Sequence, residues 1–262
     1  MISLKNSDQI AKMRQAGALL YEVLQQLKEA VRPGISTAEL DALAEELIRK
    51  GGAIPSSLHY EGYPRSICAS VDDAVVHGIP SEKQILKEGQ IISLDCTLLL
   101  DGWQADSALT VGVGQISAEA QSLIDITEQC FWKGVRQAIV GNRLGDIGYA
   151  VQSWAERHGC NAIRDLTGHG IGREMHEDPA VPNYGTAGRG IRLRKGMTIC
   201  VEPMICAGDW HVTVDDDEWC YRTRDHSLCS HYEHTIAITA EGLPEILTYP
   251  GFTWDKAPKE DA

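Results

Sequence analysis

Apolar residues return at three- and four-residue steps in the first part of the chain, a spacing typical of helices that bury one face. The first such stretch begins at Ser7 and carries leucines as far as Leu27 before Pro33-Gly34 ends it. The second follows Ser36, with Glu39 three residues later, which is the capping-box pattern that begins a helix. We therefore predict two amphipathic helices in this region.

The same pattern returns in the middle of the chain. Ser117 begins a third apolar-periodic stretch, which we expect to continue to Ile139, where Gly141-Asn142 closes it. A fourth stretch runs from about Asp146 to Gly159. A segment of short apolar runs, typical of strands, follows each pair of stretches. Repetition of this order indicates an internal duplication.

A constant offset of 107 residues relates the two copies. The helical positions Gly34, Leu40, Leu47 and Gly52 match Gly141, Ile147, Trp154 and Gly159. The strand-like segments 86–95 and 193–202 keep the same offset, and a looser match relates His77 to His169 at an offset of 92. We predict an α+β fold in two layers, built from pseudo-twofold related helix–helix–sheet halves. The halves are expected at about residues 7–114 and 117–240, within a single domain of residues 1–262.

Acidic residues interrupt the apolar strands. Asp95 lies in one apolar run and Asp106 in the next, with Asp101-Gly102 between them as a strong signal for a two-residue hairpin loop. In that register Asp106 faces Thr97, and Asp95 lies one diagonal step away on the same face, roughly 7–8 Å across the sheet. Buried carboxylates are costly unless they are paired or bind a cation. The hairpin is therefore predicted to hold two metal-binding carboxylates.

The second half has matching acids and adds a histidine. Glu202 stands 107 positions after Asp95, and Glu233 stands 127 positions after Asp106. His169 lies in a glycine-flanked stretch that lacks the Gly-Lys-Ser/Thr sequence of a phosphate-binding loop. Any one of these acids alone would more often be a surface or salt-bridged residue. Together, four carboxylates and one imidazole favour a pair of divalent ions such as Mn, Fe, Co or Zn.

The charge balance narrows the classes of partner. Of 262 residues, 37 are Asp or Glu and 24 are Lys or Arg, which gives a formal net charge of −13. That excess disfavours binding to nucleic acid or to an anionic membrane surface. No apolar run is long enough to span a bilayer, and no signal-peptide pattern begins the chain, so we expect a cytoplasmic protein. The eight cysteines form no Cys-x-x-Cys pair and are expected to be reduced and mostly buried.

These motifs together resemble those of the type I methionine aminopeptidases. The resemblance extends over about residues 4–250 and rests on motifs that occur in the order of that family, namely Asp95, Asp106-Ser107-Ala108, residues 167–172, Val201-Glu202-Pro203 and Tyr232-Glu233-His234-Thr235. It implies the pita-bread fold, a pseudo-twofold α/β duplication. It also implies metal-assisted removal of the N-terminal methionine from nascent polypeptides, with a preference for a small second residue.

The resemblance assigns a role to each predicted metal ligand. Asp95 would bind one ion in bidentate fashion, and His169 would bind the other. Asp106 and Glu233 would bridge the two ions. Glu202 would complete the second site and assist proton transfer.

The same resemblance assigns the residues that meet the substrate. His77 would lie near the scissile amide and His176 would contact the substrate carbonyl, where donors that strengthen as charge develops assist catalysis. A monovalent cation is expected nearby, close to Asp72. The methionine side chain would lie in a pocket of aromatic and sulfur-bearing residues, namely Tyr60, Tyr63, Cys68, Met175 and Trp219.

Several positions depart from the family pattern and leave fine specificity and metal preference open: Ser57, Asp72, Glu174, Met175 and His231. Two other functions also stay open, a proline-directed peptidase of the same fold and a non-catalytic pita-bread binding module. The expected partners are nascent polypeptide N-termini, with the ribosome as a further candidate, and the expected state is a monomer. The tail from residue 252 to residue 262 is expected to fray.

Overall fold

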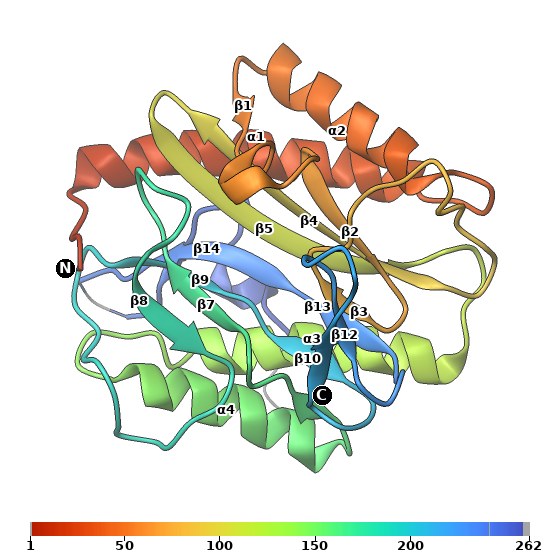
Figure 1. The fold of residues 1–262 in the computed structure, drawn as a ribbon. Helices are drawn as coiled ribbons and strands as arrows, with labels where there is room; N and C mark the ends of the chain where they lie inside the picture. Colours follow the sequence, from red (N-terminus) through yellow and green to blue (C-terminus); the bar gives the residue numbers. More distant parts are fainter. Residues whose placement is uncertain (1, 241, 259–262) are drawn as a thin grey trace.

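An antiparallel sheet forms the centre of the computed structural model, which describes residues 2–240 and 242–258 (Figure 1). One pair of helices packs against each half of this sheet, and the two interfaces bury most of the apolar core. The helices are α1 (Ser7–Ala30), α2 (Thr37–Lys50), α3 (Ala118–Val135) and α4 (Leu144–Arg157). Short 3₁₀ turns lie at Tyr60–Gly62 and Trp254–Lys256.

The strands fall into one large sheet and two small ones. The large sheet contains β1 (Ile54–Pro55), β2 (Ile67–Val71), β4 (Ile91–Leu100), β5 (Trp103–Gly112), β7 (Thr167–Gly170), β8 (Glu177–Pro182), β9 (Thr198–Val201), β14 (Glu233–Ala237) and β15 (Glu245–Ile246). One small sheet contains β6 (Asn161–Ala162), β10 (Met204–Cys206) and β13 (Cys229–His231). The other contains β3 (Ala74–Val76), β11 (Val212–Val214) and β12 (Tyr221–Thr223).

The large sheet shows the predicted duplication. The strands β2, β4 and β5 pair in that order, and β7, β9 and β14 pair in the same way in the second half. At the middle of the sheet β5 pairs with β14, and Ser107 lies opposite His234. These two residues are 127 positions apart, the offset that also relates Asp106 to Glu233. A local twofold axis therefore passes between Ser107 and His234, and the predicted duplicated α+β fold is confirmed.

The helix starts follow the offset of 107 residues as well. The helices α2 and α4 have fourteen residues each and begin at equivalent positions. In both, the carboxylate of the third helical residue accepts the backbone N–H of the cap residue. Glu39 accepts from Ser36 at 2.8 Å, and Asp146 accepts from Arg143 at 2.7 Å. The duplication therefore extends to the hydrogen bonds that begin each helix.

The predicted hairpin between β4 and β5 has the predicted register. Asp101 and Gly102 have φ angles of 50° and 77°, the left-handed pair that a two-residue hairpin turn requires. This turn places Thr97 directly opposite Asp106. The hairpin register therefore places the two acids on the same face of the sheet.

The third helix is shorter than expected. It ends at Val135 rather than Ile139, because the chain tightens into a turn in which the Ala138 amide donates to the Val135 carbonyl at 2.9 Å. The Asn142 side chain then donates to the Gln137 carbonyl at 3.0 Å, so that carbonyl does not need a helical partner.

The predicted offset of 92 between His77 and His169 is wrong. The strand β7 pairs with β9 as β2 pairs with β4, and in these pairings Gly170 and Val71 occupy equivalent positions. The offset is therefore 99 residues, which relates His77 to His176.

The described part of the C-terminal tail is packed. Phe252 stacks on Trp132 with ring centroids 4.9 Å apart, and the Trp254 indole N–H donates to the Pro244 carbonyl at 3.0 Å. The expected fraying of residues 252–262 therefore does not apply to residues 252–258. Residues 259–262 lie outside the described residues.

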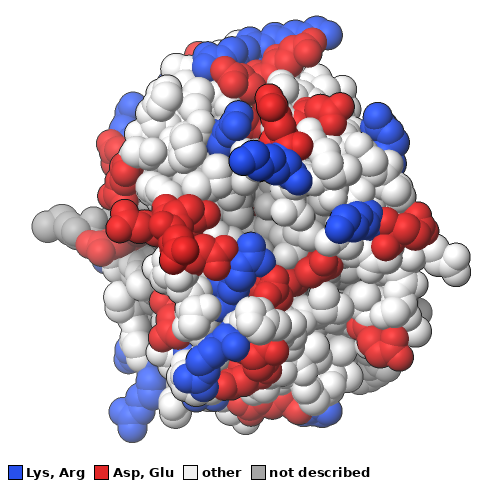
Figure 2. Space-filling view, turned by 45° about the vertical axis from the view of Figure 1, so that its right-hand side comes forward, with Lys and Arg blue, Asp and Glu red and all other residues white. Residues whose placement is uncertain are grey.

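Acidic and basic side chains are interspersed on the face drawn in Figure 2, where Lys and Arg do not gather into one continuous patch. Within the described residues, none of the helices combines the length and the apolar character that crossing a membrane requires. All eight cysteines are free and buried, as expected.

Candidate metal centre

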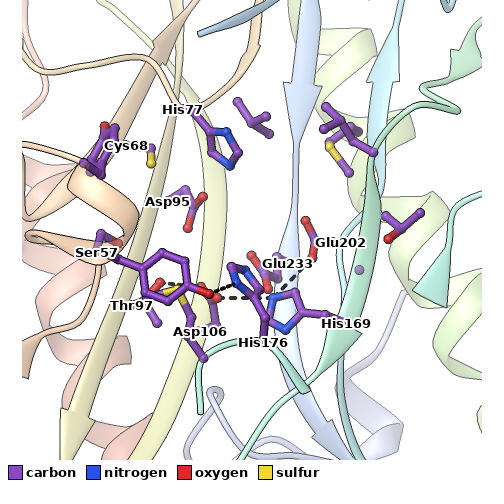
Figure 3. Close-up of a pocket in the computed structure, with 18 of the residues that line it drawn as sticks. Ser57, Cys68, His77, Asp95, Thr97, Asp106, His169, His176, Glu202 and Glu233 are labelled. Atoms are coloured by element: carbon purple, nitrogen blue, oxygen red, sulfur yellow. Dashed lines mark hydrogen bonds and ion pairs between the residues drawn. The ribbon is translucent and has the colours of Figure 1, made fainter. Parts of the chain in front are cut away.

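A cavity of about 510 Å³ opens on the sheet face that points away from the helices (Figure 3). Alternation along β5 sets this face, because Asp106 lines the cavity while Ser107 lies on the other side among residues of α1 and α3. Every side chain predicted for the site lines this cavity: Tyr60, Tyr63, Cys68, His77, Asp95, Asp106, His169, Met175, His176, Glu202, Trp219 and Glu233.

The first half contributes two carboxylates from the β4–β5 hairpin. Asp95 and Asp106 point toward the centre of the cavity from neighbouring strands (Figure 3). Thr97, opposite Asp106, donates its hydroxyl to the Asp106 Oδ1 atom at 3.0 Å. That hydrogen bond holds one carboxylate oxygen and leaves the other directed at the second half.

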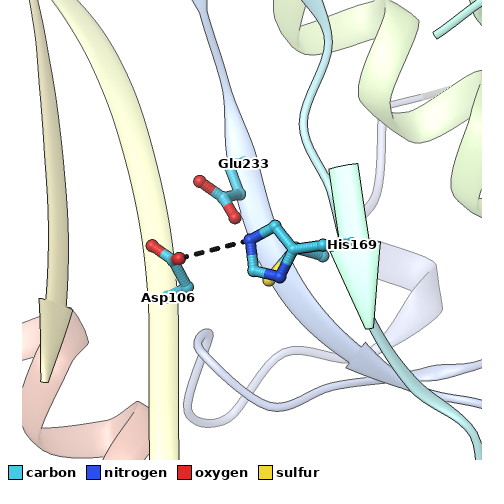
Figure 4. A group of neighbouring side chains, drawn as sticks. Asp106, His169 and Glu233 are labelled. Atoms are coloured by element: carbon cyan, nitrogen blue, oxygen red, sulfur yellow. Dashed lines mark ion pairs between the residues drawn. The ribbon is translucent and has the colours of Figure 1, made fainter. Parts of the chain in front are cut away.

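The second half meets these acids with an imidazole and two glutamates. The Nε2 atom of His169 lies 3.5 Å from Asp106 Oδ2 and 3.6 Å from Glu202 Oε1. The other ring nitrogen, Nδ1, lies 2.9 Å from the Gly170 carbonyl oxygen, which fixes the ring and leaves Nε2 free to act as a ligand. Glu233 enters from β14 beside Asp106 (Figure 4).

The carboxylates are crowded and poorly hydrated. Asp106 is 5% exposed and Glu233 is 2% exposed, and the described lining of the cavity contains no Lys or Arg. Burial, together with the charge of Asp106, raises the pKa of Asp95 and of Glu233 well above the usual range. Burial also raises the pKa of Glu202 to about 8, although the neighbouring His169 opposes this shift.

One glutamate oxygen lacks the partner that its burial calls for. The Oε1 atom of Glu233 is buried and has no hydrogen-bond partner among the described residues. Burial lowers the pKa of His169, but contact with Asp106 and the charge of Glu202 outweigh burial and raise it to about 9. Burial raises the pKa of three of the carboxyl groups, the neighbouring carboxylates raise the pKa of His169, and divalent ions would relieve this crowding of negative charge. The residues present fit the predicted metal pair.

Sequence reasoning missed one histidine of this cluster. His231 was noted only as a departure from the family pattern, yet its Nε2 atom lies 3.7 Å from Glu202 Oε2 and 3.8 Å from Glu233 Oε2. These three residues form one group that could hold a metal ion. A second group joins Cys200 to the expected Asp106, His169 and Glu233. The spacing of His231 and Glu233, two residues apart, is a sequence signal for their proximity, because alternate residues of an extended chain point to the same side.

Two histidines flank the carboxylates. The Nδ1 atom of His176 lies 2.8 Å from the Tyr60 hydroxyl, and its ring makes an edge contact with His169 at a centroid distance of 4.4 Å. His77, with a φ of 58°, lies edge-on to Trp219 at a centroid distance of 6.3 Å. Burial lowers the pKa of His77 below its usual value, so the ring is neutral near pH 7.

An apolar region adjoins the acids on the side of the first half. Tyr63 is buried, donates its hydroxyl to the Ile67 carbonyl at 3.0 Å and meets Trp219 edge-on at a centroid distance of 5.1 Å. Cys68 lies opposite Asp95 in the sheet and is also buried. Because the Tyr63 hydroxyl is bonded to the backbone, the walls of this region offer apolar surface to a ligand.

The chain resembles characterised proteins over nearly its whole length. The model of metallopeptidase family M24 matches residues 11–240. A methionine aminopeptidase of Clostridium acetobutylicum is 50% identical over 248 residues, which covers 95% of this chain and 99% of that protein. The crystal structure of a methionine aminopeptidase from Rickettsia prowazekii matches with a TM-score of 0.93 and 42% identity, covering 95% of this chain and all of that one. An Xaa-Pro dipeptidase from Bacillus anthracis shares the fold, with a TM-score of 0.74 and 24% identity, but this chain covers only 63% of it.

Proposed function

The chain belongs to metallopeptidase family M24, and from that premise we propose that its cavity removes the N-terminal methionine from polypeptides. The observation that supports this most directly is the convergence of four carboxylates and His169 beside an apolar pocket. The carboxylates provide a place for metal ions and for the free amino group of a substrate. The pocket provides a place for one apolar side chain.

We assign the metal ligands to Asp95, Asp106, His169, Glu202 and Glu233. Asp106 and Glu233 stand at the middle of the set, where β5 pairs with β14, and are suited to bridge two ions. Divalent ions such as Mn, Fe, Co or Zn, when bound here, would activate water and polarise the substrate carbonyl.

The side chains around the ions move protons and stabilise charge. The Glu202 carboxylate accepts a proton from the attacking water and returns it to the leaving amine, and its position beside His169 holds it for this task. His77 and His176 donate hydrogen bonds to the oxygen that becomes negative in the transition state. Tyr60 holds the His176 ring through the bond between its hydroxyl and Nδ1.

The pocket selects methionine by shape and by polarisability. Tyr63 and Trp219 make flat walls, and Cys68 and Met175 add sulfur atoms, a combination that suits a flexible thioether. A small second residue leaves room for the scissile bond to approach the carboxylates. The substrate is therefore a polypeptide with a free N-terminal methionine, as presented by newly made chains in the cytoplasm. We expect the chain to act there as a monomer.

A peptide panel with defined metals tests this function. Wild-type protein loaded with Co²⁺, Mn²⁺, Fe²⁺ or Zn²⁺ is incubated with Met-Gly, Met-Leu and Xaa-Pro peptides, and free amino acids are measured. We expect release of methionine from the Met-Gly peptide, slower release from Met-Leu, and loss of release in His169→Ala. The exposed acid Glu22 on α1 gives a matched control, and Glu22→Gln keeps the activity. Cleavage of the Xaa-Pro peptide alone would assign a proline-directed peptidase, and no cleavage in any metal would contradict the proposal.

A further inference from the structure

His231 stands between two of the assigned metal ligands without touching either. Its Nε2 atom lies 3.7 Å from Glu202 Oε2 and 3.8 Å from Glu233 Oε2. We propose that His231 is a further ligand of the metal centre and binds the ion that Glu202 and Glu233 hold. This inference rests on the metal centre of the proposed function and adds a second imidazole to it.

The burial of His231 demands a partner for its ring. The side chain is 1% exposed, and neither Nδ1 nor Nε2 has a hydrogen-bond partner among the described residues. Buried polar atoms are almost always bonded to protein, water or an ion. An unpaired group loses its hydrogen bonds to water on burial and gains no replacement, which costs free energy. The Nε2 atom faces two carboxylates, so the missing partner of this nitrogen is one that a nitrogen lone pair and two carboxylate oxygens can share. A divalent cation meets that description.

The distances fit an intervening ion better than a direct hydrogen bond. Nitrogen–oxygen hydrogen bonds are about 2.7–3.2 Å long, and both separations exceed that range. Metal–nitrogen and metal–oxygen bonds of about 2.0–2.2 Å each bring ligand atoms to roughly this spacing around one ion. The donor atoms of Glu202, His231 and Glu233 all lie within 4.8 Å of one another.

The backbone holds His231 firmly in this position. The Thr110 hydroxyl accepts the His231 N–H at 2.9 Å and also lies 2.9 Å from the His231 carbonyl oxygen. Across the small sheet His231 pairs with Met204, which is the residue after Pro203. These contacts fix the backbone from which the ring extends, and burial limits the positions that the ring can take.

The equivalent position in the first half holds a buried side chain that has a hydrogen-bond partner. Gln104 precedes Asp106 by two residues, as His231 precedes Glu233. The Gln104 side chain is also buried, but its Oε1 atom accepts the Ser56 hydroxyl at 2.6 Å. The second half has no such partner for His231 among the described residues. The two halves therefore differ in whether this buried side chain has a hydrogen-bond partner.

A second imidazole changes the metals that the site prefers. Imidazole ligands favour Zn²⁺, Co²⁺ and Fe²⁺ over Mn²⁺, which prefers oxygen ligands, and a variant without His231 keeps only the imidazole of His169. The wild-type protein should therefore bind Zn²⁺ and Co²⁺ more strongly, relative to Mn²⁺, than a variant that lacks the ring.

X-ray absorption spectroscopy of the Zn²⁺-loaded wild-type protein tests the ligation without any substitution. With both ions bound, two coordinating histidines give an average of about one imidazole per ion, whereas His169 alone gives about one for every two ions. We expect the higher value. An average that matches His169 alone would overturn the proposal.

Two variants extend the test to affinity. In His231→Gln we expect Zn²⁺ affinity, measured by competition with a chelator, to fall at least about tenfold and Mn²⁺ affinity to fall less. The matched control is His234→Gln, because His234 is buried nearby but bonded to Thr248 at 2.8 Å. Equal changes for both metals, or equal changes in both variants, would contradict ligation. Failure of the wild-type protein to release methionine would instead contradict the proposed function, whatever the number of imidazoles per ion.

Discussion

The two halves of this molecule share a scaffold and divide the chemistry unequally. Each half places one acid on or directly after a strand next to the centre and a second acid on a central strand. These acids are Asp95 and Asp106 in the first half and Glu202 and Glu233 in the second. Only the second half adds a histidine to the cluster through β7. The duplication therefore supplies matching positions for carboxylates, while single substitutions supply the groups that make the site asymmetric.

The position equivalent to His169 shows this asymmetry most clearly. Because Val71 and Gly170 are equivalent, the residues before them, Ser70 and His169, are equivalent as well. The Ser70 hydroxyl accepts the Gly78 backbone N–H at 3.1 Å and takes no part in the cavity. One half thus uses the position for a structural hydrogen bond, and the other uses it to direct an imidazole into the cavity beside the carboxylates.

The central acids give the largest expected effect. Asp106→Asn and Glu233→Gln should each lower kcat/KM by at least about 10³-fold, since each removes several kcal/mol of charge stabilisation from both ions. Because the two residues are related by the local twofold axis, we expect similar losses. Steady-state assays on a Met-Gly peptide, together with metal analysis of each variant, measure this. A loss confined to one of the two would show that only one half holds the bridging ligand.

The flanking histidines should give a smaller and equally informative effect. His77 and His176 are equivalent at the offset of 99 residues, and both face the cavity. His77→Ala and His176→Ala should each lower kcat by about 10²-fold, with smaller changes in KM, because hydrogen bonds to a developing oxyanion strengthen in the transition state. Metal content should stay at the wild-type value in both. A rise in KM alone would assign the histidine to substrate binding.

Much of this arrangement could be predicted from local signals. The Asp101-Gly102 turn determines the hairpin register, and that register alone places Asp95 and Asp106 on one face. The Ser36-Glu39 capping box predicts where α2 begins, whereas α4 begins at Leu144, two residues before the expected Asp146. These features depend on residues close together in sequence, which is why sequence alone suffices.

Other features depend on contacts that the sequence does not display. The correspondence of β7 with β2 follows from pairing in the sheet, and a short match around His77 suggested a wrong offset. His231 becomes part of the cluster only because β13 leads directly into β14 beside Glu202. The approach of His231 to Glu202 therefore arises from tertiary packing, and only its spacing from the assigned ligand Glu233 is visible in the sequence.

Removing the metal should make stability depend on pH. The folded-state pKa of Glu202 is raised from 4.5 to about 8, so its contribution is fully present below pH 4.5 and lost as the pH rises through 8. The pKa of His169 is raised from 6.5 to about 9, so its contribution is also lost as the pH rises. Thermal unfolding in a chelator should therefore show a falling midpoint between about pH 5 and 9, and added Zn²⁺ should reverse the fall. A midpoint that rises over this range without metal would contradict the pKa assignment.

The smallest expected effect is a difference in stability between substitutions at two equivalent glycines, one in each half, that differ in one backbone contact. Gly89 and Gly196 are equivalent at the offset of 107 residues, and both have a φ of 87°, which disfavours any residue with a Cβ atom. A Cβ at Gly89 would meet nothing closer than 3.9 Å, whereas one at Gly196 would lie 2.6 Å from the Lys5 carbonyl oxygen. Gly89→Ala should therefore cost about 1 kcal/mol from conformation alone, and Gly196→Ala should cost at least about 2 kcal/mol because the N-terminal segment must also move.

Urea unfolding of the two variants measures the difference, and equal costs would show that the segment around Lys5 yields without penalty. The contact exists because this segment packs on the second half, where the Lys5 amide donates to the Gly196 carbonyl at 2.7 Å, so the copies differ in what covers them even where their backbones agree.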